Sequence, residues 1–198
     1  MSDAVPPLFA SLADLLYRVE VTDAAGARLG ADAGVTAAVD LVRAQGAQGR
    51  KAIFIGNGGS AAIASHQAVD FWKNGGVRAI AFNDTSLLTC IGNDYGFAQV
   101  FEKPVEMFAD PGDVLIAISS SGRSENVLRG SRAARERGCR VVTLSGFAPD
   151  NPLRGLGDIN FYAPGQTYGV VEITHLAICH AIADAIVAAR TGMDAPPR

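Results

Sequence analysis

After Arg50, short apolar runs alternate with stretches whose apolar residues recur at helical spacing. The runs are KAIFIGN (51–57), VRAIAF (77–82), DVLIAISSS (113–121), CRVVTLSG (139–146) and DINFYA (158–163). Strands that are apolar along their whole length are typical of a parallel sheet whose two faces are both covered by helices. The alternation therefore predicts an α/β protein with a parallel five-stranded sheet in flavodoxin-like order.

Helical spacing between and after these strands predicts helices over about 60–73, 97–108, 124–137 and 169–190. The first fifty residues are Ala-rich and predict an N-terminal arm of two helices, with a break near Gly26 to Gly30. A chain of 198 residues suffices for one ordinary domain but hardly for two. We therefore expect a single domain over 1–198, with helices in 1–50, an α/β core in 51–192 and a tail at 193–198.

The composition narrows the class of protein. Hydrophobic residues make up 48%, and the net charge is −3, which excludes a disordered chain and leaves no basic surface for nucleic acid. Cys90, Cys139 and Cys179 are widely spaced and form no C-x-x-C pair, which argues against disulfides or a zinc knuckle. The N-terminus lacks the basic start of a signal peptide, and we expect no membrane span. A cytoplasmic location is predicted.

Open parallel sheets bind ligands beyond the carboxyl ends of their strands, where helix N-termini present unpaired N–H groups. The first predicted strand ends in Gly56-Asn57-Gly58-Gly59-Ser60, whose glycines allow a ligand to approach closely. Ala61 stands where a dinucleotide-binding G-x-G-x-x-G motif needs glycine, and no Lys follows as in a Walker motif. This spacing argues against a nucleotide-binding oxidoreductase, and a plain strand-to-helix turn remains an alternative.

The third predicted strand ends in a second polar loop, Ser119-Ser120-Ser121-Gly122-Arg123-Ser124. Four hydroxyls around one glycine, at the start of a helix, favour a phosphate monoester, and Arg123 would add positive charge. The alternative is a serine-rich helix cap. Both donor-rich loops follow neighbouring strands, so together they indicate a ligand site more strongly than either loop alone.

Several motifs together resemble a known family: GNGGSA (56–61) with a His six residues after its Ser, IGNDYGF (91–97), GDVLIAISSSGRSENV (112–127) and a C-terminal helix with a late His. They resemble the SIS (sugar isomerase) domain family, most closely its phosphoheptose isomerase group, from about Lys51 to Ala189. The resemblance implies a homotetramer with active sites between subunits and a sugar-phosphate substrate. The residues implied to bind substrate are Asn57, Gly58, Ser60, Asp94, Ser119, Ser120, Ser121 and Ser124.

Moving a carbonyl between C2 and C1 of a phosphosugar requires a base and an acid, and a divalent metal can polarise the carbonyl. His66 and Asp70 share one face of a predicted helix, being four residues apart, although this pair could also be a surface contact. The resemblance implies that Asp70 is the catalytic base, in place of the family's Glu, and that His180 is the complementary acid or base. His175 matches no catalytic position and is predicted to lie in the core.

In zinc-bearing members of the group, the corresponding positions are the metal ligands, which here are His66, Asp70, Glu172 and His180. Glu172 stands where Gln is usual, and two neighbouring carboxylates stay ionised more easily around a cation. The resemblance and these exchanges imply Zn²⁺ or a similar divalent ion. Residues eight apart on a helix are separated by about 12 Å. Glu172 and His180 therefore reach one ion only by inclining toward each other, or a neighbouring chain completes the site.

The resemblance implies an aldose–ketose isomerase that converts sedoheptulose 7-phosphate to a heptose 7-phosphate through an enediol(ate). Asn74 stands at a position where the family has Arg, so either Lys73 supplies the charge or the pocket suits another sugar. The alternative is a non-catalytic SIS protein, either a phosphosugar-binding regulator or a replication-initiator-associating protein. Asp70 together with His180 favours the enzyme, because a sensor has no chemical need for that pair.

Overall fold

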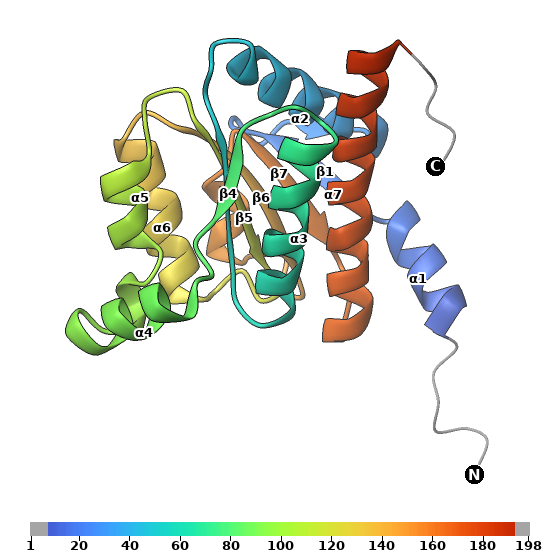
Figure 1. The fold of residues 1–198 in the computed structure, drawn as a ribbon. Helices are drawn as coiled ribbons and strands as arrows, with labels where there is room; N and C mark the ends of the chain where they lie inside the picture. Colours follow the sequence, from blue (N-terminus) through green and yellow to red (C-terminus); the bar gives the residue numbers. More distant parts are fainter. Residues whose placement is uncertain (1–7, 193–198) are drawn as a thin grey trace.

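The computed structural model describes residues 8–192; the predicted tail, 193–198, and residues 1–7 lie outside the described part. Five adjacent parallel strands form most of the sheet (Figure 1). They are β3 (Ala52–Gly56), β4 (Ala79–Ala81), β5 (Val114–Ser119), β6 (Arg140–Gly146) and β7 (Ile159–Ala163). Their order, β4-β3-β5-β6-β7, is the predicted flavodoxin-like order.

The predicted strand count was wrong, because the sheet has seven strands. The break expected near Gly26 to Gly30 and the residues just before it contain β1 (Glu20–Asp23) and β2 (Arg28–Leu29), an antiparallel hairpin. β1 extends the sheet antiparallel to β7, with Val21 opposite Phe161. The Asp23 carboxylate closes the turn by accepting from the N–H groups of Ala25 and Ala27, both at 2.9 Å. Strands of two and four residues are too short to show a period in the sequence.

Helices cover both faces of the sheet (Figure 1). One face carries α2 (Ala31–Gly46), α3 (Gly59–Lys73) and α7 (Tyr168–Thr191), and α1 (Leu8–Tyr17) packs against α7. The other face carries α4 (Thr85–Asp94), the 3₁₀ turn η1 (Phe97–Gln99), α5 (Glu102–Phe108) and α6 (Glu125–Glu136). A second 3₁₀ turn, η2 (Pro152–Gly155), precedes β7.

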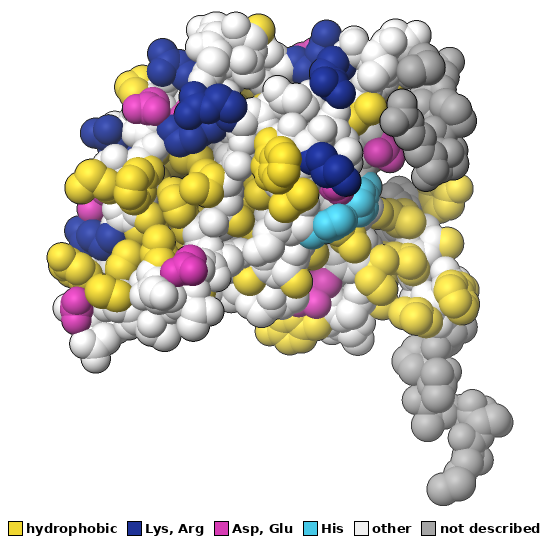
Figure 2. Space-filling view, viewed as in Figure 1, with side chains coloured by type: hydrophobic (Ala, Val, Ile, Leu, Met, Phe, Trp, Pro, Cys, Tyr) yellow, Lys and Arg dark blue, Asp and Glu magenta, His cyan; other side chains and the backbone are white. Residues whose placement is uncertain are grey.

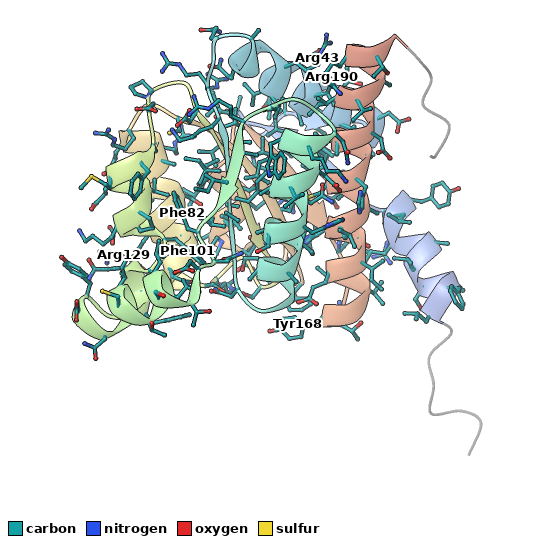
Figure 3. The ribbon with its side chains drawn as sticks, viewed as in Figure 1. Arg43, Phe82, Phe101, Arg129, Tyr168 and Arg190 are labelled. Carbon is teal, nitrogen blue, oxygen red and sulfur yellow. The ribbon has the colours of Figure 1, made fainter. Side chains whose placement is uncertain are left out.

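The helix predicted over 97–108 was wrong in part, because η1 and α5 are separate and α4 precedes them. Val100 and Phe101 are fully buried between η1 and α5, so the chain turns there to place both side chains in the core. Phe82 and Phe101 belong to the apolar layer on this side of the sheet (Figure 3). Burying a side chain of this size stabilises the fold by roughly 1.5–3 kcal/mol, which outweighs the stabilisation lost by interrupting the helix.

Of the described helices, α7 alone has the length and hydropathy of a membrane span, with a mean hydropathy of 1.7 over eighteen residues. No membrane span was expected from the sequence, in which polar residues such as Glu172, His180 and Asp184 interrupt the apolar run. α7 packs against α1, α2 and α3, and residues such as His175 and Ile182 are buried. Its hydropathy is therefore that of a core helix covered on several sides.

Candidate active site

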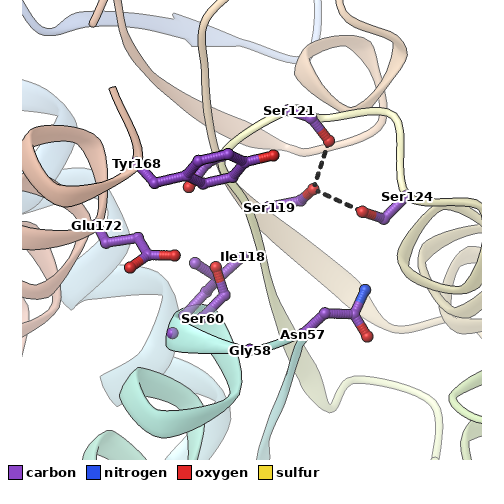
Figure 4. A pocket seen from close by; sticks show the side chains of 11 residues that line it. Asn57, Gly58, Ser60, Ile118, Ser119, Ser121, Ser124, Tyr168 and Glu172 are labelled. Atoms are coloured by element: carbon purple, nitrogen blue, oxygen red, sulfur yellow. Dashed lines mark hydrogen bonds between the residues drawn. The ribbon is translucent and has the colours of Figure 1, made fainter. Parts of the chain in front are cut away.

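A cavity of about 250 Å³ lies where β3 and β5 end and α3 and α6 begin (Figure 4). We call it the serine cup. It contains every substrate-binding residue predicted above except Asp94. Its lining consists of Asn57, Gly58, Gly59, Ser60, Ile118, Ser119, Ser120, Ser121, Ser124, Tyr168 and Glu172.

We call residues 119–124, at the end of β5, the serine loop. Its hydroxyl groups lie around one point. The Ser119 hydroxyl donates to Ser124 Oγ at 3.3 Å and lies 3.5 Å from Ser121 Oγ (Figure 4). The Gly122 N–H donates to Ser119 Oγ at 3.2 Å. Ser120 Oγ is buried and has no hydrogen-bond partner in the described residues. Because buried hydroxyls normally find a partner, this arrangement favours a ligand rich in acceptors.

The serine loop is held from behind by Asn151. Gly122 has φ +60°, and a Cβ there would lie 2.0 Å from Asn151 Oδ1. The buried Asn151 amide donates to the carbonyl of Ala148 at 2.8 Å and to Ser145 Oγ at 3.2 Å. The Leu153 N–H donates to the Gly122 carbonyl at 3.2 Å. Only glycine fits this close approach, so the loop's shape depends on Gly122.

An amide pair joins the glycine loop after β3 to the first turn of α6, which follows the serine loop. Asn57 and Asn126 exchange hydrogen bonds of 2.9 and 2.8 Å through their side chains. The predicted contribution of Arg123 to the cup is not seen. Its guanidinium makes an exposed ion pair with Asp150 at 2.9 Å and does not line the cavity. Glu172 is thus the one charged residue among those that line the serine cup.

His66 and Asp70 on α3 and His180 on α7 form a second cluster. Asp70 Oδ2 lies 3.3 Å from His66 Nε2 and 3.7 Å from His180 Nδ1, and the two imidazole centroids are 5.4 Å apart. The His66 side chain is 55% exposed and that of His180 41%, so the cluster opens to solvent. Figure 2 shows the histidines together on this face. The predicted catalytic pair, Asp70 and His180, is therefore brought together within one chain.

The two oxygens of Asp70 have different neighbours. Oδ2 faces both imidazoles, whereas Oδ1 accepts a hydrogen bond of 3.1 Å from the side-chain amide of Asn74. Asn74 stands one turn after Asp70, at the α3 C-terminus. This bond orients the carboxylate so that one oxygen remains directed at the histidines.

Three of the four predicted metal ligands converge, with one donor atom of His66, Asp70 and His180 each lying within 4.8 Å of the others. Glu172 lies apart from them. Its carboxylate is packed against Gly59 at the start of α3, where a Cβ on Gly59 would meet Oε2 at 2.3 Å. The eight-residue spacing explains the separation, because it places Glu172 about 12 Å from His180 along α7. Within one chain, Glu172 belongs to the serine cup.

Asp94 lies away from the serine cup, exposed near the end of α4. Its carboxylate accepts from the Asn93 amide at 2.8 Å and lies 3.6 Å from Cys90 Sγ. Sequence reasoning missed three lining residues, Gly59, Ile118 and Tyr168, of which Tyr168 comes from α7. Its position four residues before Glu172 was a usable signal, since such residues share a helix face.

His175 lies in the core, as predicted. Its Nε2 lies 3.0 Å from the Ser145 carbonyl, and Nδ1 is buried with no hydrogen-bond partner among residues 8–192. Burial lowers the pKa of His175 to about 4, although the bond to Ser145 opposes this shift. The imidazole is therefore neutral near pH 7, with its N–H donated to β6. His175 thus joins α7 to the strand that ends beside the serine loop.

Comparison with known proteins identifies the family of the chain. The family model described as "SIS domain" matches residues 28–146. A phosphoheptose isomerase of Geobacter sulfurreducens is 41% identical over 146 residues, which are 71% of this chain and 77% of the relative. One of Aromatoleum aromaticum is 38% identical over 187 residues, covering 87% of this chain and 94% of the relative.

Solved structures give the same result. The phosphoheptose isomerase of Neisseria gonorrhoeae is 36% identical, with a TM-score of 0.73 over 77% of this chain and 85% of that protein. That of Francisella tularensis is 27% identical, with a TM-score of 0.78 over 90% of this chain and 93% of that protein. Sequence motifs, fold and relatives agree, and the chain belongs to the SIS domain family, within its phosphoheptose isomerase group.

Proposed function

We propose that the chain is an aldose–ketose isomerase that converts sedoheptulose 7-phosphate to a heptose 7-phosphate. The observation that carries this proposal is the cluster of Asp70 with two imidazoles on the same helices, α3 and α7, that form the serine cup. The relatives named phosphoheptose isomerase support the same substrate class.

The reaction moves one carbon-bound proton and the proton of one hydroxyl. Asp70 takes the proton from C1 of the ketose and returns it to C2, through an enediol(ate). His180, whose Nδ1 lies 3.7 Å from Asp70 Oδ2, carries the hydroxyl proton from the oxygen on C1 to the oxygen on C2. Asp70 is one methylene shorter than the family's Glu, which withdraws the carboxylate by about 1.5 Å. The Asn74 amide holds the Asp70 carboxylate in a defined direction.

The donor set of the cluster fits a divalent metal such as Zn²⁺, because two imidazoles and one carboxylate offer atoms within 4.8 Å of one another. His66, Asp70 and His180 would hold the ion. Glu172 would join them only if its side chain moved away from Gly59 or if it came from a neighbouring chain. When bound, the ion supplies Lewis-acid stabilisation of the enediolate charge.

The length of the substrate agrees with the separation of the two sites. The hydroxyl groups that line the serine cup suit the phosphate end of the substrate. An extended seven-carbon chain spans roughly 9–10 Å from phosphorus to C1, given bonds of about 1.5 Å. Ser60 and His66 are about 9 Å apart along α3. A phosphate in the cup therefore leaves C1 and C2 within reach of the cluster.

We further propose a homotetramer in the cytoplasm, with active sites that neighbouring chains complete. Asp94 lies outside the serine cup, and Trp72 on α3, two residues after Asp70, exposes 53% of its surface. The free thiols of all three cysteines suit a reducing compartment. Light scattering during gel filtration tests the assembly. A mass four times the 20.6 kDa of the chain supports it, and a monomer contradicts it.

The test of function is turnover. Purified protein is incubated with ketose phosphates of five, six and seven carbons, and the products are identified by NMR. We expect product from sedoheptulose 7-phosphate. Asp70→Asn should abolish turnover while binding of the sugar phosphate persists, and Asp184→Asn, which changes an exposed carboxylate on α7, should not. Near-normal turnover by Asp70→Asn refutes the role of Asp70.

A non-catalytic regulator is the second candidate. A Vibrio vulnificus protein, NanR, solved with ManNAc-6P, shares the fold with a TM-score of 0.69 at 19% identity. That likeness concerns the fold alone. A protein that only senses a sugar phosphate needs the serine cup but not a carboxylate between two imidazoles, so the cluster favours the enzyme. Tight binding of the substrate with no turnover by the unaltered chain would favour the regulator.

A further inference from the structure

Tyr168 has a position in the serine cup that the reaction described above does not use. It is the first residue of α7 and lines the cavity opposite the serine loop. Figure 4 shows its ring extending across the cup, with the hydroxyl on the side of Ser119 and Ser121. Among the described residues, this hydroxyl makes no hydrogen bond.

The direction of the Tyr168 ring is set by a neighbour. Phe147 contacts it edge to face, with centroids 4.9 Å apart and planes at 84°. Phe147 has φ +55° and is the one non-glycine residue of the described chain with a positive φ. Its carbonyl accepts a hydrogen bond of 2.8 Å from the Tyr162 hydroxyl, which helps to hold this backbone conformation. An unfavourable conformation is thus maintained where it presents a ring to Tyr168.

The charges around the cup indicate where a phosphate would sit. Glu172 occupies the α3 side, against Gly59, and repels an anion there. The lining includes no Lys or Arg, because Arg123 pairs with Asp150 instead. A phosphate is therefore favoured on the serine-loop side and depends on neutral donors. The Tyr168 hydroxyl is such a donor, and it reaches that side from α7 (Figure 4).

We propose that the Tyr168 hydroxyl donates a hydrogen bond to the substrate's phosphate group and closes the serine cup from the α7 side. Tyr168 is thus a binding residue that selects phosphorylated over unphosphorylated sugars. The inference rests on the proposed function for the identity of the sugar, but the phosphate contact is testable without turnover.

The test replaces only the hydroxyl, with Tyr168→Phe, and uses Tyr17→Phe as a matched control on an exposed ring of α1. Affinities for inorganic phosphate and for sedoheptulose 7-phosphate are measured by calorimetry. A hydrogen bond to a charged group predicts that both dissociation constants rise roughly tenfold in Tyr168→Phe and stay unchanged in Tyr17→Phe. Phe147→Ala should weaken both ligands by severalfold, because the ring loses its support.

Several results overturn the inference. Affinity for inorganic phosphate within twofold of the unaltered chain in Tyr168→Phe contradicts it, and so does a loss confined to the sugar phosphate, which places the contact on the sugar. Failure of the unaltered chain to bind phosphate also refutes it. If Tyr168→Phe weakens phosphate binding but the unaltered chain turns over no sugar phosphate, the Tyr168 contact stands and the isomerase function fails.

Discussion

Substituting Gly122 by Ala tests whether the shape of the serine loop depends on its contact with Asn151. Gly122 has φ +60°, and an added Cβ would lie 2.0 Å from Asn151 Oδ1 and 2.3 Å from its Cγ. Asn151 is 3% exposed, so its side chain cannot move aside into solvent. The loop or Asn151 must therefore be displaced.

Two contributions set the magnitude. The left-handed backbone costs an L-residue roughly 1–2 kcal/mol wherever it occurs. Displacing Asn151 breaks its hydrogen bonds to Ser145 Oγ and Ala148 and the one it accepts from the Arg154 N–H, a further loss on the order of 2 kcal/mol. Gly122→Ala should thus lower the free energy of unfolding by roughly 3–4 kcal/mol.

Gly49→Ala is the matched control. Gly49 has φ +75° and open space around the position of a Cβ, so it isolates the backbone contribution of about 1–2 kcal/mol. Urea unfolding gives both free energies, and calorimetry gives the affinity for inorganic phosphate. Gly122→Ala should also weaken phosphate binding, whereas Gly49→Ala should not. Equal destabilisation by the two variants, or unchanged phosphate affinity in Gly122→Ala, would refute the reasoning.

The remaining predictions concern the buried ionisable groups. Because burial lowers the pKa of His175 from 6.5 to about 4, the unfolded chain binds a proton below pH 6.5 that the folded chain excludes until about pH 4. Acidification from pH 6.5 to about pH 4 should lower the free energy of unfolding by about 3 kcal/mol. Urea unfolding at both pH values measures this change, which should be much smaller in His175→Gln. Burial raises the pKa of Cys139 to about 11 and that of Cys179 to about 12. A thiol reagent should therefore label the exposed Cys90 in the folded protein, and these two only on unfolding. Rapid labelling of three thiols in the folded protein contradicts this.

The central strands and the serine cup could be predicted because the physical signals are local. β3 and β5 are buried on both faces and read as uninterrupted apolar runs, and their carboxyl ends must meet at one edge of a parallel sheet. The four-residue spacing of His66 and Asp70 likewise fixes a shared helix face. These features require no knowledge of distant contacts.

Other features depend on contacts that no local pattern carries. β1 exists because its backbone pairs with β7, more than a hundred residues later, and its four residues are too few to show alternation. Glu172 was grouped with His180 through resemblance, whereas packing against Gly59 places its carboxylate in the serine cup. The position of Tyr168 depends on its contact with the ring of Phe147. Phe147 has an unusual backbone conformation, which composition does not reveal.

The most direct test of the account follows hydrogen at the reacting carbons. Sedoheptulose 7-phosphate is incubated in D₂O with the unaltered chain and with Asp70→Asn, and proton NMR reports both the product and the exchange of hydrogen at C1 and C2. The account predicts aldose formation with deuterium entering at these carbons, and loss of both in Asp70→Asn although the ligand still binds. Product formation and exchange by Asp70→Asn at near the unaltered rate would contradict it.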